Sequence, residues 1–267
     1  MNFVKTNIIA VINQKGGVGK TTTVINLAAS LSIMGQNNLV IDLDPQGNAT
    51  TGLGKSNNDD DNNIYNLLIN KINLKDGLQK TDITNLDIFG SNVNLSGLEV
   101  ETANDENRVF ILKDILNKNS EIIKKYDNVF IDCPPSLSLL TIMALVSANE
   151  ILVPLQTEFF ALEGITQLVK TIDRIKIKLN PSLSVRGILL TMFDKRNKLS
   201  SQVDKEARDY FKEKVYQSVI PRNVRLSEAP SHGLPCVTYD KSCSGSKAYI
   251  KLAEEFISQR RNIGSAA

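Results

Sequence analysis

The chain has 267 residues, of which 42% are hydrophobic and 22% charged, and its formal net charge is +2. These are ordinary globular values, and the length suffices for one large α/β domain, which we expect over residues 1–267. The three cysteines include no C-x-x-C pair and there is one histidine, which argues against a zinc site, a disulfide framework and His-based triad chemistry.

The net charge conceals an asymmetry between the two parts of the chain. Residues 1–150 carry 12 Lys/Arg and 17 Asp/Glu, whereas residues 151–267 carry 19 and 12. A basic half beside an acidic half is compatible with a polyanion partner, and equally with an ordinary solvated surface. No signal peptide precedes the first expected strand, so we expect a reduced, cytoplasmic protein.

The first expected elements are a strand, a glycine-rich loop and a helix. The apolar run 8–12 predicts a strand buried on both faces. The loop 13–22 (NQKGGVGKTT) follows, and apolar residues then recur at helical spacing from Val24 to Leu31, with Gly35 as a C-terminal stop. Strand, loop and helix in this order are typical of a phosphate-binding loop.

The chemistry of the loop follows from its residue types. Glycines let backbone N–H groups approach an anion, and the N-terminus of the following helix adds positive partial charge. Lys20 is then expected to serve phosphate oxygens and Thr21 to serve Mg²⁺. The pattern G-x-x-x-x-G-K-[ST] is not fully met, because Gln14 stands at the first glycine and Lys15 follows it.

Two further strands deliver acidic residues to loops. Residues 38–44 predict a buried strand that ends in Asp44, followed by a loop over 45–50. Residues 128–132 predict another strand, which carries Asp132 into the turn Pro134–Pro135. An apolar strand with a terminal Asp is the Walker B arrangement, in which the acid holds Mg²⁺ through its water shell.

The remaining pattern alternates strands and helices. Residues 55–63 are polar and predict a solvated connection without chemistry, and the apolar segment 137–148 is too short to span a bilayer and predicts a buried helix. Further strands are expected at 86–89, 151–155, 185–192 and 215–220, and further helices at 64–69, 108–117, 162–179, 202–212 and 246–259. This alternation predicts an α/β fold with a single doubly wound, mostly parallel sheet flanked by helices.

The chain resembles the ParA/Soj group of chromosome-partitioning ATPases. The K-G-G-x-G-K-T-T form of the loop is similar to the deviant Walker A motif of the ParA/MinD group of P-loop NTPases. The runs 44–50 (DPQGNAT), 131–135 (IDCPP) and 220–233 (IPRNVRLSEAPSHG) strengthen the match, which covers roughly residues 5–258. The larger plasmid-borne relatives carry a helix-turn-helix domain ahead of the first strand, and none is expected here.

The resemblance implies roles for particular residues. Lys20 and the loop amides would hold the phosphates, Asp44 would position the attacking water, and Lys15 would reach the nucleotide of a second subunit. The implied catalytic residues are Lys15, Lys20 and Asp44, and the implied metal residues are Thr21, Asp44 and Asp132. The implied nucleotide-binding residues are Lys15, Gly16, Gly17, Val18, Gly19, Lys20, Thr21, Thr22, Met192, Pro221 and Asn223, with Pro221, Asn223 and Met192 at the adenine.

The resemblance also implies partners and a cellular role. ATP and Mg²⁺ would drive homodimerisation, the dimer would bind double-stranded DNA without sequence preference on the nucleoid, and a ParB-like partner would stimulate slow hydrolysis. The implied DNA-binding residues are Arg196, Lys198, Arg222, Arg225, Lys241 and Lys247. Contacts of this kind go mainly to phosphate and are steeply salt-dependent.

Two alternatives share the loop. A MinD-like membrane ATPase would need an amphipathic C-terminal helix, and the segment 262–267 (NIGSAA) after the expected last helix is short and polar. An electron-transfer relative of the nitrogenase iron-protein type would need two suitably placed cysteines for an iron–sulfur cluster. Cys133 follows the Walker B acid, whereas Cys236 and Cys243 lie far down the chain. His232, in a Ser-His-Gly turn, is expected to be structural.

Overall fold

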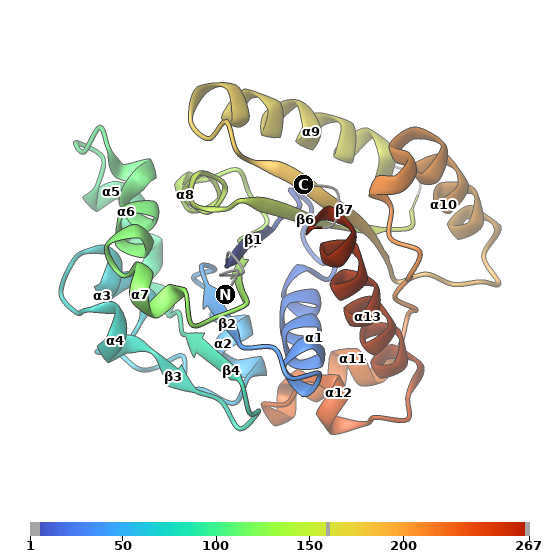
Figure 1. Ribbon diagram of the computed structural model, residues 1–267, viewed down its shortest axis with the longest axis horizontal. Helices are drawn as coiled ribbons and strands as arrows, with labels where there is room; N and C mark the ends of the chain where they lie inside the picture. Colours follow the sequence, from blue (N-terminus) through green and yellow to red (C-terminus); the bar gives the residue numbers. More distant parts are fainter. Residues whose placement is uncertain (1–5, 159–160, 265–267) are drawn as a thin grey trace.

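The computed structural model describes residues 6–158 and 161–264. These residues form a seven-stranded sheet in the order β3-β4-β2-β5-β1-β6-β7 (Figure 1). All neighbouring strands pair in parallel except β3, which is antiparallel to β4 at one edge. The strands are β1 (Asn7–Val11), β2 (Asn38–Asp42), β3 (Gln79–Lys80), β4 (Leu86–Phe89), β5 (Asn128–Asp132), β6 (Glu150–Gln156) and β7 (Ser184–Thr191).

Helices fill the connections between the strands. The longer ones are α1 (Lys20–Ile33), α6 (Ile111–Lys118), α8 (Leu139–Ser147), α9 (Ala161–Lys178), α10 (Lys198–Phe211) and α13 (Ser244–Gly264). The short ones are α2 (Asn48–Gly52), α3 (Ile64–Leu68), α4 (Leu74–Gly77), α5 (Leu98–Glu101), α7 (Ser120–Ile123), α11 (Val224–Glu228) and α12 (Cys236–Tyr239).

The sheet is buried on both faces, because successive residues of a strand point to opposite sides. On one face Ile9 and Val11 of β1 pack with α1, α12 and α13. On the other, Ala10 and Ile12 pack in a cluster that includes α6, α8 and α9. In Figure 1, α1 and α13 lie together below β6, and α9 lies above it. The expected doubly wound α/β fold is confirmed.

The position of β1 decides where the polar loops meet. After β1 the chain runs outward through β2 and β4, returns to β5 between β1 and β2, and then crosses to β6 and β7. In a parallel sheet all carboxyl ends lie at one edge, and the change of winding direction beside β1 opens a crevice there. The loops that follow β1, β2, β5 and β7 therefore converge.

Several expected elements differ from the structure. The strand expected over 38–44 ends at Asp42, and the helix expected from residue 202 begins at Lys198. Residues 215–220 do not form a strand, and only isolated bridges link Val215 to Ile188 and Pro221 to Phe193. The loop expected over 45–50 ends early, because α2 begins at Asn48. The last helix runs to Gly264 rather than 259, so residues 262–264 of the expected tail are helical and residues 265–267 lie outside the described residues.

Smaller differences concern burial and short elements. On α10, Tyr210 is 67% exposed, whereas Val203 and Ala207 are buried. The two-residue edge strand β3 carries no periodic signal and was not expected. Among the described residues, no helix combines the length and apolar character needed to cross a bilayer.

Residues 215–222 lie along β7 without joining the sheet as a strand. The N–H groups of Tyr216 and Ile220 donate to the carbonyls of Ile188 and Leu190. Between these bonds, the N–H groups of Gln217 and Ser218 donate to the two carboxylate oxygens of Glu255 on α13, at 2.7 and 2.8 Å. A side chain of α13 thus supplies the acceptors that a ladder would have supplied.

We expect Glu255→Gln to lower the free energy of unfolding by about 1 to 2 kcal/mol, because glutamine offers one acceptor oxygen to two donors and carries no charge. Urea unfolding of the variant measures this loss. Glu254→Gln, one position earlier and exposed, is the control, expected within about 0.5 kcal/mol of the parent. Equal stability of the two variants would contradict the anchoring role of Glu255.

Candidate functional site

The glycine-rich loop after β1 is tied to its neighbours on both sides. The Asn13 side chain donates to the carbonyl of Pro154 at 2.8 Å and accepts the N–H of Lys15 at 3.0 Å. The Thr191 hydroxyl at the end of β7 donates to the carbonyl of Val18 at 2.8 Å. Gly17 and Gly19 adopt φ values of +74° and +88°, a conformation that L side chains rarely adopt.

The loop leads into α1, whose first turn contains no acidic residue. The partial positive charge of the helix N-terminus is therefore uncompensated by the helix itself. Lys20, the first residue of α1, is only 6% exposed, and its ammonium donates to the carbonyl of Lys15 at 3.1 Å. Burial lowers the pKa of Lys20, and the nearby Asp132, Cys133 and Asp44 oppose that effect. This arrangement favours an anion at the helix N-terminus.

Asp42 and Asp132 end the adjacent strands β2 and β5, where the register pairs them directly. Both are fully buried. Asp42 accepts the N–H and hydroxyl of Thr50 and the N–H of Asp44, and thereby holds the loop after β2. Burial raises the pKa of Asp42 to about 6 despite these hydrogen bonds.

Asp132 is different, because among the described residues no donor meets hydrogen-bond geometry with either carboxylate oxygen, although the Thr21 hydroxyl lies near enough to affect its pKa. Burial, and then the charge of Asp42, raise its pKa well above the usual value, while Thr21 and Lys20 act in the opposite direction. A buried carboxylate without donors is costly unless something else fills its shell. A hydrated Mg²⁺ between Thr21, Asp44 and Asp132 would do so, and oxygen ligands of this kind fit that ion.

A cavity of about 580 Å³ opens over the loop. Its walls include Gly16, Gly17, Gly19, Lys20, Thr21 and Thr22 of the loop, Asp44, Gln46 and Asn48 after β2, and Leu226, Ser227, Pro230 and Ser231 from the C-terminal half. Asp44 is 7% exposed, and its Oδ1 accepts the N–H of Gln46 at 3.0 Å. Two groups of expected residues, from the loop and from the second strand, thus share one cavity.

A smaller hollow of about 110 Å³ continues from this cavity, since Gly19, Thr22, Leu226 and Ser227 line both. Met192, Pro221 and Asn223, the expected adenine contacts, line it together. Met192 has φ +51°, a backbone conformation that non-glycine residues adopt at a cost. The Asn223 side chain caps α11 and donates to the Ser244 hydroxyl at 2.8 Å.

Lys15 does not line the cavity and points elsewhere. Its ammonium forms an ion pair with Glu158, just after β6. The Lys15 side chain is 55% exposed and that of Glu158 is 30% exposed. The chain therefore has one lysine buried at the helix N-terminus and a second one at the surface beside the same loop.

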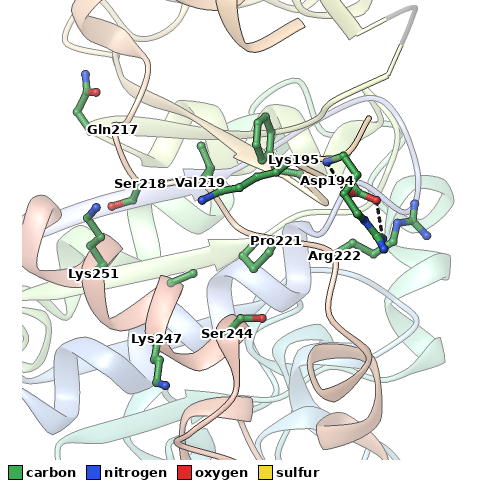
Figure 2. Close-up of a pocket in the computed structure, with 13 residues that line it drawn as sticks. Asp194, Lys195, Gln217, Ser218, Val219, Pro221, Arg222, Ser244, Lys247 and Lys251 are labelled. Atoms are coloured by element: carbon green, nitrogen blue, oxygen red, sulfur yellow. Dashed lines mark hydrogen bonds and ion pairs between the residues drawn. The ribbon is translucent and has the colours of Figure 1, made fainter. Parts of the chain in front are cut away.

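A broad groove of about 680 Å³ lies next to the hollow, and Pro221 and Arg222 line both (Figure 2). We call it the basic groove, defined by Lys195, Arg196, Arg222, Lys247 and Lys251. It runs between the turn after β7 and the start of α13. Arg196, 91% exposed, pairs with Asp194, the one acidic residue of the lining.

The structure brings together only part of the expected DNA-binding set. Arg196, Arg222 and Lys247 share the basic groove, whereas Lys198, Arg225 and Lys241 do not line it. Arg225 forms ion pairs with Glu228 at 2.6 Å and Asp240 at 3.6 Å. Lys198 begins α10, and Lys241 is exposed in the turn before α13.

Several residues of the site were missed from the sequence. The predicted strand 38–44 ends in Asp44, so the sequence pattern does not single out Asp42, although an acid within an apolar strand is itself an indication of a functional site. Lys195 and Lys251 carry no motif, and Glu158 and Thr191 become visible only when β6 and β7 lie beside the loop. His232 stacks on Tyr239 with ring centroids 4.9 Å apart, and Cys133 is fully buried.

A protein-family model and two named relatives match most of this chain. The family described as an AAA domain matches residues 6–185. The chain is 49% identical over 258 residues to the chromosome partitioning protein ParA of Caulobacter vibrioides, covering 96% of this chain and 95% of that protein. It is 46% identical to the chromosome-partitioning ATPase Soj of Treponema pallidum, covering 93% of this chain and 96% of that protein.

Solved structures show the same fold with nucleotide. Cobyrinic acid a,c-diamide synthase of Mycobacterium smegmatis, with bound ADP and magnesium, has a TM-score of 0.82 at 32% identity and covers 96% of each chain. The septum site-determining protein MinD of Pyrococcus horikoshii, complexed with Mg-ADP, has a TM-score of 0.77 at 27% identity, covering 94% of this chain and 96% of that one.

We expect Asp132→Asn to stabilise the nucleotide-free protein by about 1 to 3 kcal/mol, because a neutral side chain removes the cost of burying an acid without donors. The same change should reduce the extra stability that magnesium and ATP provide. Thermal unfolding with and without both ligands measures the two effects.

Asp42→Asn is the matched control, and it should destabilise the nucleotide-free protein, since its carboxylate accepts three hydrogen bonds. An Asp132→Asn protein that is less stable than its parent without nucleotide would show that the carboxylate has partners in the apo state.

Proposed function

Because the chain belongs to the ParA/Soj family of chromosome-partitioning ATPases, and is accordingly a P-loop ATPase that uses Mg²⁺, we propose that it works as an ATP-dependent DNA-partitioning switch. Binding of ATP joins two copies face to face, and the pair binds double-stranded DNA on the nucleoid without sequence preference. A ParB-like partner then stimulates hydrolysis and releases the DNA.

The observation that carries the proposal is the different placement of two lysines, Lys20 and Lys15. Lys20 already occupies the buried position beside the helix N-terminus, so the loop has no local need of a second cation. Lys15 lies half exposed at the edge of the same loop, held by Glu158 of its own chain. An exposed ion pair of this kind is worth about 0 to 1 kcal/mol, so a phosphate of a second subunit could replace Glu158 at little cost.

The roles of the remaining site residues follow from phosphoryl-transfer chemistry, which is mostly positioning and charge neutralisation. Loop amides and Lys20 hold the phosphates, and Asp44 orients the attacking water. Thr21 and Asp132 hold the metal, which neutralises charge on the phosphates when bound. Without a partner such sites turn over as slowly as about 10⁻⁴ to 10⁻² per second, which leaves room for stimulation.

The continuity of the three hollows supports a link between nucleotide and DNA. We call the cavity over the glycine-rich loop the phosphate cavity and the smaller hollow beside it the adenine hollow. The two share four residues, and the adenine hollow shares Pro221 and Arg222 with the basic groove. A nucleotide that reorders residues 221–223 would therefore reposition a wall of the groove. Five cations and one carboxylate in a broad groove suit a phosphodiester backbone better than base edges.

We expect Lys15→Ala to bind a non-cleavable ATP analogue with magnesium and yet remain monomeric, because Lys20 and the loop amides are untouched. Lys20→Ala should lose both nucleotide binding and dimerisation. Light scattering coupled to size exclusion measures the assembly, and titration with a fluorescent analogue measures binding.

Glu158→Gln serves as the matched control for this prediction. It releases Lys15 without removing it, so the variant should dimerise at least as readily as the parent. If the parent protein itself stays monomeric when saturated with the analogue and magnesium, the proposed switch is wrong.

For DNA, we expect the double variant Lys195→Ala/Lys247→Ala to dimerise normally but to bind nonspecific duplex more weakly. The slope of log affinity against log salt should become shallower by about 2, since roughly one counterion is released per phosphate contact. Lys118→Ala on α6, outside the groove, is the control. An unchanged salt slope would remove the basic groove from the DNA-binding surface.

A further inference from the structure

Two cysteines that are seven positions apart in the chain meet at the turn between α12 and α13. Cys236 begins α12 and Cys243 directly precedes α13. Their sulfur atoms lie 3.4 Å apart, and both are free thiols. Cys236 is fully buried, whereas Cys243 is partly exposed. The pair therefore has one member that solvent can reach and one that it cannot.

The surroundings of Cys243 favour its thiolate. Its sulfur accepts the N–H of Ser246 at 3.4 Å, so the side chain occupies the capping position of α13. Burial works to raise the pKa of Cys243, but hydrogen bonds from Ser246 and from the N–H of Gly245 outweigh it and lower that pKa. Burial raises the pKa of Cys236 to about 11. One thiol is thus activated and its neighbour is kept protonated.

We propose that Cys236 and Cys243 form a reversible redox pair, which a hydroperoxide oxidises to an intramolecular disulfide across the turn between α12 and α13. An accessible thiolate beside a second thiol is the arrangement by which proteins sense peroxides. Cys133 is excluded from this chemistry, because it is fully buried at the end of β5 and its pKa is raised well above the usual value by burial.

The reaction has two balanced steps. The Cys243 thiolate attacks one oxygen of the hydroperoxide, the O–O bond breaks, and the departing oxygen leaves as water or an alcohol after it takes a proton. This step oxidises Cys243 to a sulfenic acid. The Cys236 sulfur then attacks the Cys243 sulfur, the S–O bond breaks, and the hydroxyl leaves as water with the proton of the Cys236 thiol. The hydroperoxide is the oxidant, and two thiols supply its two electrons.

One hydrogen bond links the neighbourhood of the pair to a residue of the smaller hollow. Ser244, next to Cys243, accepts the Asn223 side chain at 2.8 Å. Closing the sulfur separation from 3.4 Å to the roughly 2.05 Å of a disulfide requires a shift of the turn, and we expect this shift to weaken the hydrogen bonds of Ser246 to the two sulfurs. Oxidation therefore releases the first turn of α13 and, through Ser244, loosens Asn223. This consequence rests on the proposed role of Asn223 at the adenine, whereas disulfide formation does not.

The test is oxidation of the full-length protein by hydrogen peroxide. We expect the three free thiols to fall to one, the intact mass to fall by two hydrogen atoms, a peptide map to link Cys236 to Cys243, and dithiothreitol to reverse all three changes. Cys133→Ser should form the same link. Cys243→Ser should form none, and Cys236→Ser should stop at the sulfenic acid.

A disulfide that involves Cys133, a link between two molecules, or irreversible addition of oxygen to Cys243 would overturn the proposal. The affinity for a fluorescent ATP analogue is measured on the same samples, and we expect it to weaken severalfold on oxidation and to recover on reduction. A disulfide that forms while the affinity stays constant would overturn the coupling through Ser244 alone. If no disulfide forms on oxidation, the proposed redox pair is wrong, and the proposed switch is unaffected by that result.

Discussion

The structure depends on how charge is buried where the strands β1, β2 and β5 end. Lys20, Asp42 and Asp132 all lie below 7% exposure, at an edge where the loop amides and the N-terminus of α1 add further positive partial charge. Only Asp42 has its hydrogen bonds fully supplied by the chain. The Lys20 ammonium donates a hydrogen bond to a loop carbonyl, and the Asp132 carboxylate has no partner within hydrogen-bond geometry among the described residues. The side chains are therefore already in place without ligands, and under the proposed function phosphate together with magnesium would supply the charges that the site lacks.

That charge arrangement is connected to a distant surface through one short stretch of chain. Residues 221–223 line the adenine hollow, and two of them line the basic groove. Leu226 of the adjoining helix α11 reaches the phosphate cavity as well. The C-terminal half therefore contributes walls to each of the three hollows described above, although its sequence carries no phosphate-binding motif. Residues of the acidic half and of the basic half thus line the same cavities.

Most of the sheet and the loop could be predicted from the sequence, because buried parallel strands leave unbroken apolar runs such as 8–12 and 129–131. The glycines and Lys20 predict a phosphate site by residue type alone. The segment 215–220 was misread because Val215 and Ile220 are buried for a different reason: they pack beside β7 while Glu255 satisfies the intervening N–H groups. The basic groove could be predicted only in part, since Lys195 and Lys251 lie on different elements and converge only in three dimensions. The contact between Cys236 and Cys243 could not be predicted either. The helix α12 and the turn after it bring the two thiols together, and no spacing rule pairs them.

The segment that lies along β7 has a consequence for self-assembly. A parallel sheet exposes unpaired backbone groups at its outermost strands, and such rims invite other chains to add on. Here the carbonyls of Ile188 and Leu190 are already occupied by Tyr216 and Ile220, and the opposite rim ends in the two-residue β3, whose Lys80 pairs with Asp87. One rim is thereby partly covered by residues 215–222, and the other offers only a two-residue strand. Strand addition at these two rims is therefore disfavoured.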